Sequence, residues 1–184
     1  MTDVENKPSI IERLRLPVRI LFVLGIVVWI GFRIVFPESP TFFSSTQPTN
    51  LGVNAGKLAV CSTKPNCVNS QTTAEDTDHS IDPLKYDFSS PTEAIANLDR
   101  ILKDLPRVDI ISETDNYLYA QVTSRWMGFV DDLEFYVNKD AGIIEVRSSA
   151  RLGESDLGVN RQRIENIRTQ LNQLYSSRNE LSDT

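Results

Sequence analysis

Residues 129–137 read FVDDLEFYV, and this stretch predicts a β-strand with two unlike faces. Apolar and polar residues alternate along it with the period of a strand. One face is formed by Phe129, Asp131, Leu133, Phe135 and Val137, and the other by Val130, Asp132, Glu134 and Tyr136. Asp131 stands out on the apolar face. It must either turn outward at a bulge near Gly128 or meet a donor, such as an arginine or a helix N-terminus.

Three further strands are predicted around this one, over residues 108–113, 117–126 and 143–150. Turns over residues 114–116 and 138–142 separate them, and Gly142 can adopt a positive φ. Short connections between consecutive strands favour an antiparallel meander.

Two amphipathic helices flank the strands. Ser90, Pro91 and Glu93 form a capping box with proline at the first helical position. A second helix is predicted over residues 159–175. The expected fold is therefore α+β: a four-stranded antiparallel meander sheet with two helices packed on one face, plus one N-terminal transmembrane helix.

The transmembrane prediction rests on residues 16–36, a 21-residue stretch that is apolar apart from Arg19 and Arg33 near its ends. About 20 residues suffice to cross a bilayer. A cleavable signal peptide is the main alternative, although no small-x-small cleavage pattern follows; a buried core helix is the other. The whole chain divides into a cytoplasmic tail (1–15), the anchor (16–36), a flexible linker (37–57), an extracytoplasmic α+β domain (58–176) and a disordered tail (177–184).

Basic residues predict the orientation of the anchor. Four of them (Lys7, Arg13, Arg15 and Arg19) precede its uncharged core over residues 20–32, whereas none follows Arg33 until Lys57. The positive-inside rule then places the N-terminus in the cytoplasm and the domain in a periplasm or thylakoid lumen. Cys61 and Cys67 would form a short-loop disulfide there, with two reduced thiols as the alternative.

The net charge of −6 divides into +2 over residues 1–36 and −8 over the remainder. An acidic body argues against nucleic acid as a partner. Two cysteines and one histidine, His79, are too few for a structural zinc site, so we expect no metal and no cofactor.

An acidic cluster of Asp131, Asp132 and Glu134 is the first candidate site. Asp132 and Glu134 share the polar strand face, where Arg147 of the next strand can meet them. A cross-strand salt-bridge ladder is one interpretation. A carboxylate pair for acid–base chemistry or metal binding is the other.

Polar and basic residues before and within the last helix form the second candidate site: Arg147, Arg151, Ser155, Asp156, Asn160, Arg161 and Arg163. Ser155, Asp156 or Asn160 can cap the helix, but Arg161 and Arg163 oppose its dipole. They either join an ion-pair network that fixes the end of the sheet to the helix, or line an anion pocket for a phosphate or carboxylate.

No nucleophile elbow, Walker loop, dinucleotide fingerprint or HExxH motif is present, and no motif places a triad around His79. We therefore lean against an enzyme. The sequence predicts a non-catalytic, membrane-anchored binding or assembly module for a protein partner, an anionic small molecule or a lipid head group. A hydrolase or metal-dependent enzyme using Asp131, Asp132 and Glu134 is the alternative. A purely structural subunit of a membrane complex is a third possibility.

Several segments together resemble the domain of unknown function 1499 family over about residues 60–174. They are Cys61 with PNCV (65–68), HSIDP (79–83), FVDDLEF (129–135), and VRSSAR (146–151) followed by GESDLGVNRQR (153–163). The resemblance implies a bacterial or plastid protein that is often exported or membrane-attached, and a cyanobacterial source. It implies no established activity, cofactor or catalytic residue.

Overall fold

The computed structural model describes residues 10–85 and 90–182, which form two compact units divided between Ser39 and Pro40. The first unit is helix α1 (Ile10–Val35) and the four residues after it. Its segment Leu14–Val35 is long and apolar enough to cross a membrane, in agreement with the predicted span, although a signal sequence would share these properties. Arg33 is buried and donates to the carbonyls of Phe36, Pro37 and Ser39, so its side chain caps the C-terminal end of the helix.

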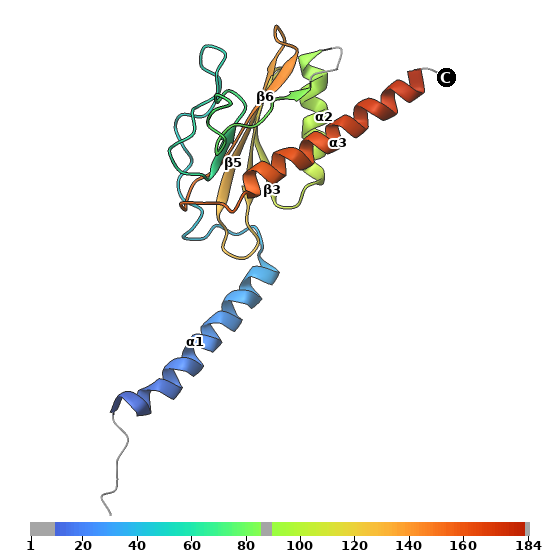
Figure 1. Cartoon of the computed structure of the whole chain (residues 1–184). Helices are drawn as coiled ribbons and strands as arrows, with labels where there is room; N and C mark the ends of the chain where they lie inside the picture. Colours follow the sequence, from blue (N-terminus) through green and yellow to red (C-terminus); the bar gives the residue numbers. More distant parts are fainter. Residues whose placement is uncertain (1–9, 86–89, 183–184) are drawn as a thin grey trace, which may run out of the picture. The chain divides into compact units, whose positions relative to one another are not determined.

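The second unit is built on one antiparallel sheet (Figure 1). Its strands are β1 (Cys67–Asn69), β2 (Leu84–Lys85), β3 (Val108–Glu113), β4 (Tyr117–Thr123), β5 (Val130–Asn138) and β6 (Ile143–Ala150). The order is β1-β6-β5-β4-β3, and β2 also pairs with β6. The four predicted strands and their meander are present, but the predicted strand number of four is wrong because β1 and β2 extend the sheet beyond β6. Strands of three and two residues are too short for alternation to reveal them.

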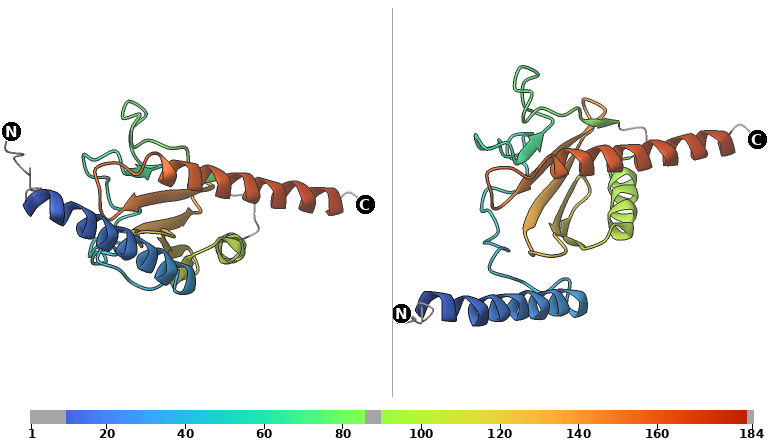
Figure 2. Two further views of the ribbon diagram at one scale, coloured as in Figure 1. Left: turned by 90° about the horizontal axis from the view of Figure 1, so that it is seen from below. Right: turned by 60° about the horizontal axis from the view of Figure 1, so that its bottom comes forward.

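Helices α2 (Pro91–Asp104) and α3 (Val159–Ser182) pack on one face of the sheet (Figure 2). The predicted cap of α2 is present, since Ser90 Oγ accepts a hydrogen bond from the Glu93 amide at 3.2 Å. The α3 helix continues past residue 175, so residues 177–182 are helical where the sequence suggested a disordered tail. Arg178 of this extension forms an ion pair with Glu93 of α2 at 2.7 Å.

The hydrophobic core lies between these helices and the sheet, as the alternation predicts. Leu133, Phe135 and Val137 of β5 point into it and are almost fully buried. Ile95 and Leu98 of α2 pack against them within one cluster. At the β5–β6 turn, Gly142 has a φ of +66°, the conformation for which a glycine was expected.

The second face of the sheet is covered by residues 41–58, which we call the strap. Thr41 Oγ1 donates to the Met127 carbonyl at 2.7 Å, and Leu58 donates its amide to Gln71 Oε1 at 2.8 Å. Phe43 also packs against Phe129, with ring centroids 5.1 Å apart and the ring planes tilted by 53°. The compact domain therefore begins at Pro40, whereas the sequence suggested a linker as far as residue 57.

Candidate functional site

Glu134 lies at the centre of the face beneath the strap and is completely buried. Its register partner on β6 is Arg147, whose Nη1 donates to Glu134 Oε2 at 2.8 Å. Oε1 accepts from the Tyr117 hydroxyl and from the Gly52 amide of the strap, each at 2.8 Å. Burial and the neighbouring Glu134 carboxylate both raise the pKa of Tyr117, so this phenol remains a donor. A buried carboxylate with three donors is satisfied.

Asp132 forms a second buried pair on the same face. Arg151 donates to both of its oxygens, the shortest contact being Nη2 to Oδ1 at 2.6 Å. The Tyr119 hydroxyl donates to Oδ1 at 2.6 Å and accepts from Gln121 Nε2 at 2.8 Å. Burial and the hydrogen bond to Asp132 raise the pKa of Tyr119 to about 12. These two groups of residues form one polar layer: Tyr117, Tyr119, Asp132, Glu134, Arg147 and Arg151.

Asp131 remains on the helix face and meets the donor that its position requires. Arg163 of α3 donates Nη2 to Asp131 Oδ2 at 2.7 Å. Burial raises the pKa of Asp131, and the attraction of Arg163 works in the opposite direction. Arg163 Nη1 also donates to Asn160 Oδ1, which accepts from the Ser148 hydroxyl as well. This cluster joins the end of the sheet to the first turn of α3.

The start of α3 is capped by Asp156, one of the three residues expected there. Its Oδ2 accepts from the Asn160 amide at 2.7 Å and its Oδ1 from the Gly158 amide at 3.1 Å. Ser155 Oγ instead accepts from the Leu157 amide in the preceding turn, at 3.2 Å. The acidic cap compensates for two arginines in the first turn of the helix.

Arg161 binds a loop rather than an acid. Its terminal nitrogens donate to the carbonyls of Thr77, Asp78 and Ser80, the last at 2.7 Å. Arg161 thereby supplies hydrogen-bond donors to carbonyl oxygens of a loop that lies outside the helices and strands.

His79 lies in the same loop, and both of its ring nitrogens are engaged. Nδ1 is 2.8 Å from the Asp76 carboxylate and Nε2 is 3.0 Å from the Lys64 carbonyl. The hydrogen bond to Asp76 is the largest cause of a raised His79 pKa. A protonated ring can donate from both nitrogens, which fits these two acceptors. Sequence reasoning missed this connecting role because neither partner belongs to a motif around the histidine.

The predicted disulfide between Cys61 and Cys67 is present and closes a loop before β1. Its Cα–Cα distance is 5.7 Å, within the ordinary range. Cys67 pairs with Ser149 of β6, so the bridge secures one edge of the sheet.

The second predicted site does not form one pocket. Arg147 and Arg151 project from the strap face of the sheet, whereas Arg163 lies on the helix face and Arg161 on the loop over residues 77–80. Each of these arginines is bonded to an acid or a carbonyl. The arrangement supports the ion-pair interpretation and removes the main argument for an anion pocket among these residues.

The acidic cluster is also divided between the two faces. Asp132 and Glu134 belong to the polar layer, whereas Asp131 bonds to Arg163 on the helix face. All three carboxylates are paired with guanidinium groups. Within the described ranges 10–85 and 90–182, no group of three or more His, Cys, Asp or Glu residues could hold a metal ion.

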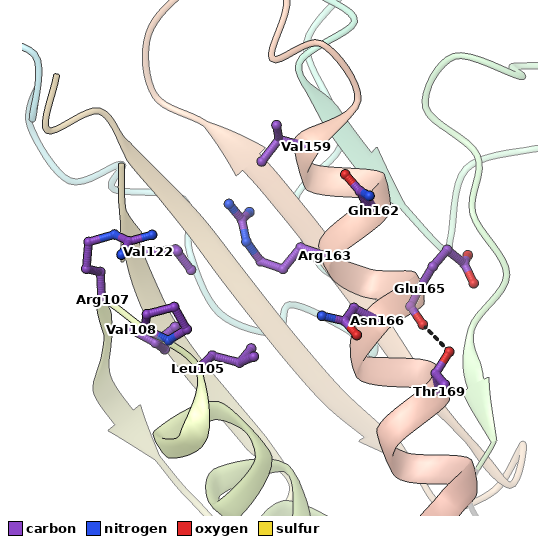
Figure 3. A pocket seen from close by; sticks show the side chains of 11 residues that line it. Leu105, Arg107, Val108, Val122, Val159, Gln162, Arg163, Glu165, Asn166 and Thr169 are labelled. Carbon is purple, nitrogen blue, oxygen red and sulfur yellow. Dashed lines mark hydrogen bonds between the residues drawn. The ribbon is translucent and has the colours of Figure 1, made fainter. Parts of the chain in front are cut away.

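A groove lies beside Arg163 on the helix side of this domain. It lies between α3 and the segment that joins α2 to β3, and has a volume of about 600 Å³ (Figure 3). Its lining comprises Leu105, Pro106, Arg107, Val108, Val122, Val159, Gln162, Arg163, Glu165, Asn166 and Thr169. Figure 3 shows Arg163 extending from α3 over the groove toward the strand side.

Arg107 provides the second cationic group of this groove. Its Nε donates to the Thr123 carbonyl at 3.0 Å, and among the described residues no hydrogen bond engages its terminal nitrogens. Glu165 lines the opposite wall but is paired with Arg168 at 2.9 Å. The groove thus combines apolar walls with donor groups, a composition typical of small-ligand sites.

The fold and the disulfide-closed loop define an α+β domain with a buried polar layer under an N-terminal strap. Residues 57–171 match the family model described as "Protein of unknown function (DUF1499)", so this chain belongs to that family. No curated protein and no solved structure gives a significant match.

Proposed function

We propose that this chain is a membrane-anchored, non-catalytic binding module whose ligand site is the groove between α3 and the α2–β3 connection. One observation carries the proposal: Arg107, whose terminal nitrogens form no hydrogen bond among the described residues, borders a groove whose walls include Leu105, Val108 and Val122. The ligand class that fits is an anionic group attached to an apolar body, such as the head group and first methylenes of a lipid. The pairing of Asp131, Asp132 and Glu134 with arginines argues against their use by a hydrolase.

The experiment uses the full chain in lipid nanodiscs with octanoate as the probe, and octanol and octylammonium as controls for charge. We expect octanoate to raise the midpoint of thermal unfolding, because the carboxylate gains guanidinium donors while the chain occupies apolar walls. Octanol and octylammonium should give smaller shifts.

Arg107→Gln should abolish the octanoate shift without lowering the ligand-free midpoint greatly. Arg100→Gln on the exposed face of α2 makes the same change in charge away from the groove and should retain the shift. Equal octanoate shifts in both variants would rule out this groove as the site.

For the anchor, we infer that the N-terminus is cytoplasmic and that the domain lies in a periplasm or thylakoid lumen. The excess of basic residues before α1 supports this orientation, and the Cys61–Cys67 disulfide suits an oxidising compartment. Alkaline phosphatase fused after Thr184 should be active only if the C-terminal side is exported. An inactive but stable fusion would contradict the orientation.

A further inference from the structure

An exposed apolar patch lies where the strap begins. Phe42 is 95% exposed, and Trp126 and Met127 of the β4–β5 loop are 47% and 38% exposed. The hydrogen bond from Thr41 to the Met127 carbonyl holds this part of the strap against the loop. Contact there is close, because a Cβ added to Gly128 would lie 2.6 Å from the Thr41 side chain. We call Phe42, Trp126 and Met127 the aromatic ridge.

A second loop continues the apolar surface at the same end of the sheet. Phe129 and Leu152 line one shallow hollow of about 210 Å³ together with Val159. Leu157, in the same loop as Leu152, is 93% exposed. Several large apolar side chains gathered at one end of a domain indicate a surface that another phase or molecule covers.

The short connection between α1 and the strap points to a membrane as the partner that covers this apolar surface. Helix α1 ends at Val35, and Thr41 is already bonded to the β4–β5 loop. Six peptide steps can reach about 20 Å at full extension. The chain therefore cannot separate Thr41, which is bonded to the loop of the aromatic ridge, from the end of α1 by more than about this distance.

The chemistry of the ridge matches a phospholipid interface. Trp rings favour the head-group layer, where apolar and polar surroundings meet, and Phe side chains are typical of the apolar face of segments that bind there. The guanidinium of Arg125 lies 5.0 Å from the centre of the Trp126 ring and brings a positive charge to the same loop. A cation beside an amphipathic ring suits lipid phosphates.

We propose that the aromatic ridge inserts into the head-group layer of the membrane that α1 spans, so that the domain rests on the lipid instead of moving freely above it. The inference depends on the proposed anchor and adds a second membrane contact to it.

The two tryptophans of the chain permit a test that separates anchor from ridge. The full-length protein is reconstituted in vesicles of phosphatidylcholine and phosphatidylglycerol whose acyl chains are brominated close to the head group. Trp126→Phe leaves Trp29 to report on α1, whereas Trp29→Phe leaves Trp126 to report on the ridge. We expect the bromolipid to quench both, and the Trp126 emission to shift to the blue relative to the protein unfolded in urea.

Phe42→Asp, added to Trp29→Phe, should reduce the quenching of Trp126 by bromolipid and increase its quenching by aqueous iodide. Val60→Asp introduces the same charge at a residue that is 83% exposed and lies outside the patch, and should leave Trp126 quenched by lipid.

The outcomes distinguish the two claims. Quenching of Trp29 with Trp126 accessible only to iodide would overturn the lipid contact and retain the anchor. Protection of Trp126 from both quenchers would indicate a protein surface on the ridge and would likewise overturn it. Absence of Trp29 quenching would overturn the anchor and, with it, the proposal that the ridge contacts the membrane that α1 spans.

Discussion

At the scale of single residues, the polar layer shows how a sheet can bury charge on the face that does not carry its core. Glu134 has three donors and Asp132 has an arginine that contacts both of its oxygens. Such pairs contribute little net stability compared with well-packed apolar residues, but removing one partner leaves a buried charge unpaired. The pairs therefore matter most when they are broken.

Glu134→Gln should lower the free energy of unfolding by about 3 to 5 kcal/mol, because Arg147 keeps its charge in a buried position. Urea denaturation of the full chain in detergent measures the change. Glu113→Gln, at an exposed position of β3, is the matched control and should cost less than about 0.5 kcal/mol. Similar losses in the two variants would show that the pair carries no special cost.

His79 predicts a dependence of stability on pH. Its folded pKa is raised above the ordinary 6.5, mainly by Asp76, so the protonated ring stabilises the native loop. This contribution is complete below the unfolded pKa and is lost as the pH rises through the folded pKa. Since His79 is the only histidine, its ring protons give one NMR titration curve. We expect a midpoint above 6.5 that Asp76→Asn lowers; a midpoint at or below 6.5 would refute this.

Strand alternation also explains which part of the site could be predicted from the sequence. The pattern assigned Glu134 and Arg147 to one polar face and Asp131 to the other, and the structure agrees. The same pattern implied that Arg147 projects away from the helices. Arg147 therefore could not meet Arg163, although a single guanidinium cluster was expected.

At the scale of the elements, the structure differs from the sequence-based expectation at the strap and at strands β1 and β2. These segments are ordered by contacts with residues that lie far away in the sequence. The strap is rich in Ser, Thr, Pro, Asn and Gly, which favours a linker. The strap is ordered because it contacts the sheet face that it covers, for example through the hydrogen bond from Gly52 to Glu134. No local sequence pattern encodes such contacts. Strands β1 and β2 likewise form through pairing with β6, a partner distant in sequence.

The disulfide is the covalent tie at this edge of the sheet. Replacing both Cys61 and Cys67 by serine should reduce the free energy of unfolding by about 2 kcal/mol, from the loop-closure entropy of a short loop. Comparison of urea midpoints for the oxidised protein and the double variant measures the loss. Dithiothreitol should lower the midpoint of the wild-type protein and leave the variant unchanged; a wild-type midpoint insensitive to the reductant would contradict a stabilising bridge.

At the scale of the whole molecule, the chain consists of an apolar helix, α1, and an α+β domain. The strap, which follows α1 in the sequence, covers one face of the sheet of this domain. The division at Ser39 and Pro40 leaves only a few residues between them. The family match over residues 57–171 omits nearly the whole strap. The strap is therefore the feature that links the family domain to the N-terminal part of this chain.

Hydrogen exchange on the full chain tests whether the strap is docked. The amides of Gly52 and Leu58 should exchange slowly because each donates to a side-chain acceptor, Glu134 and Gln71 respectively. The amide of Asp140, in the exposed turn between β5 and β6, is the reference for rapid exchange. Exchange of Gly52 as fast as in that turn would restore the picture of a free linker.

The position of the strap has a mechanical consequence. Any force that reaches the domain through Pro40 passes first along residues 41–58 and only then to the sheet. The hydrogen bond from Gly52 to Glu134 and the contact of Ser44 with Arg151 would thus bear load before the core does. Tension sufficient to peel the strap away would admit water to the paired charges while the helix-covered face stayed folded.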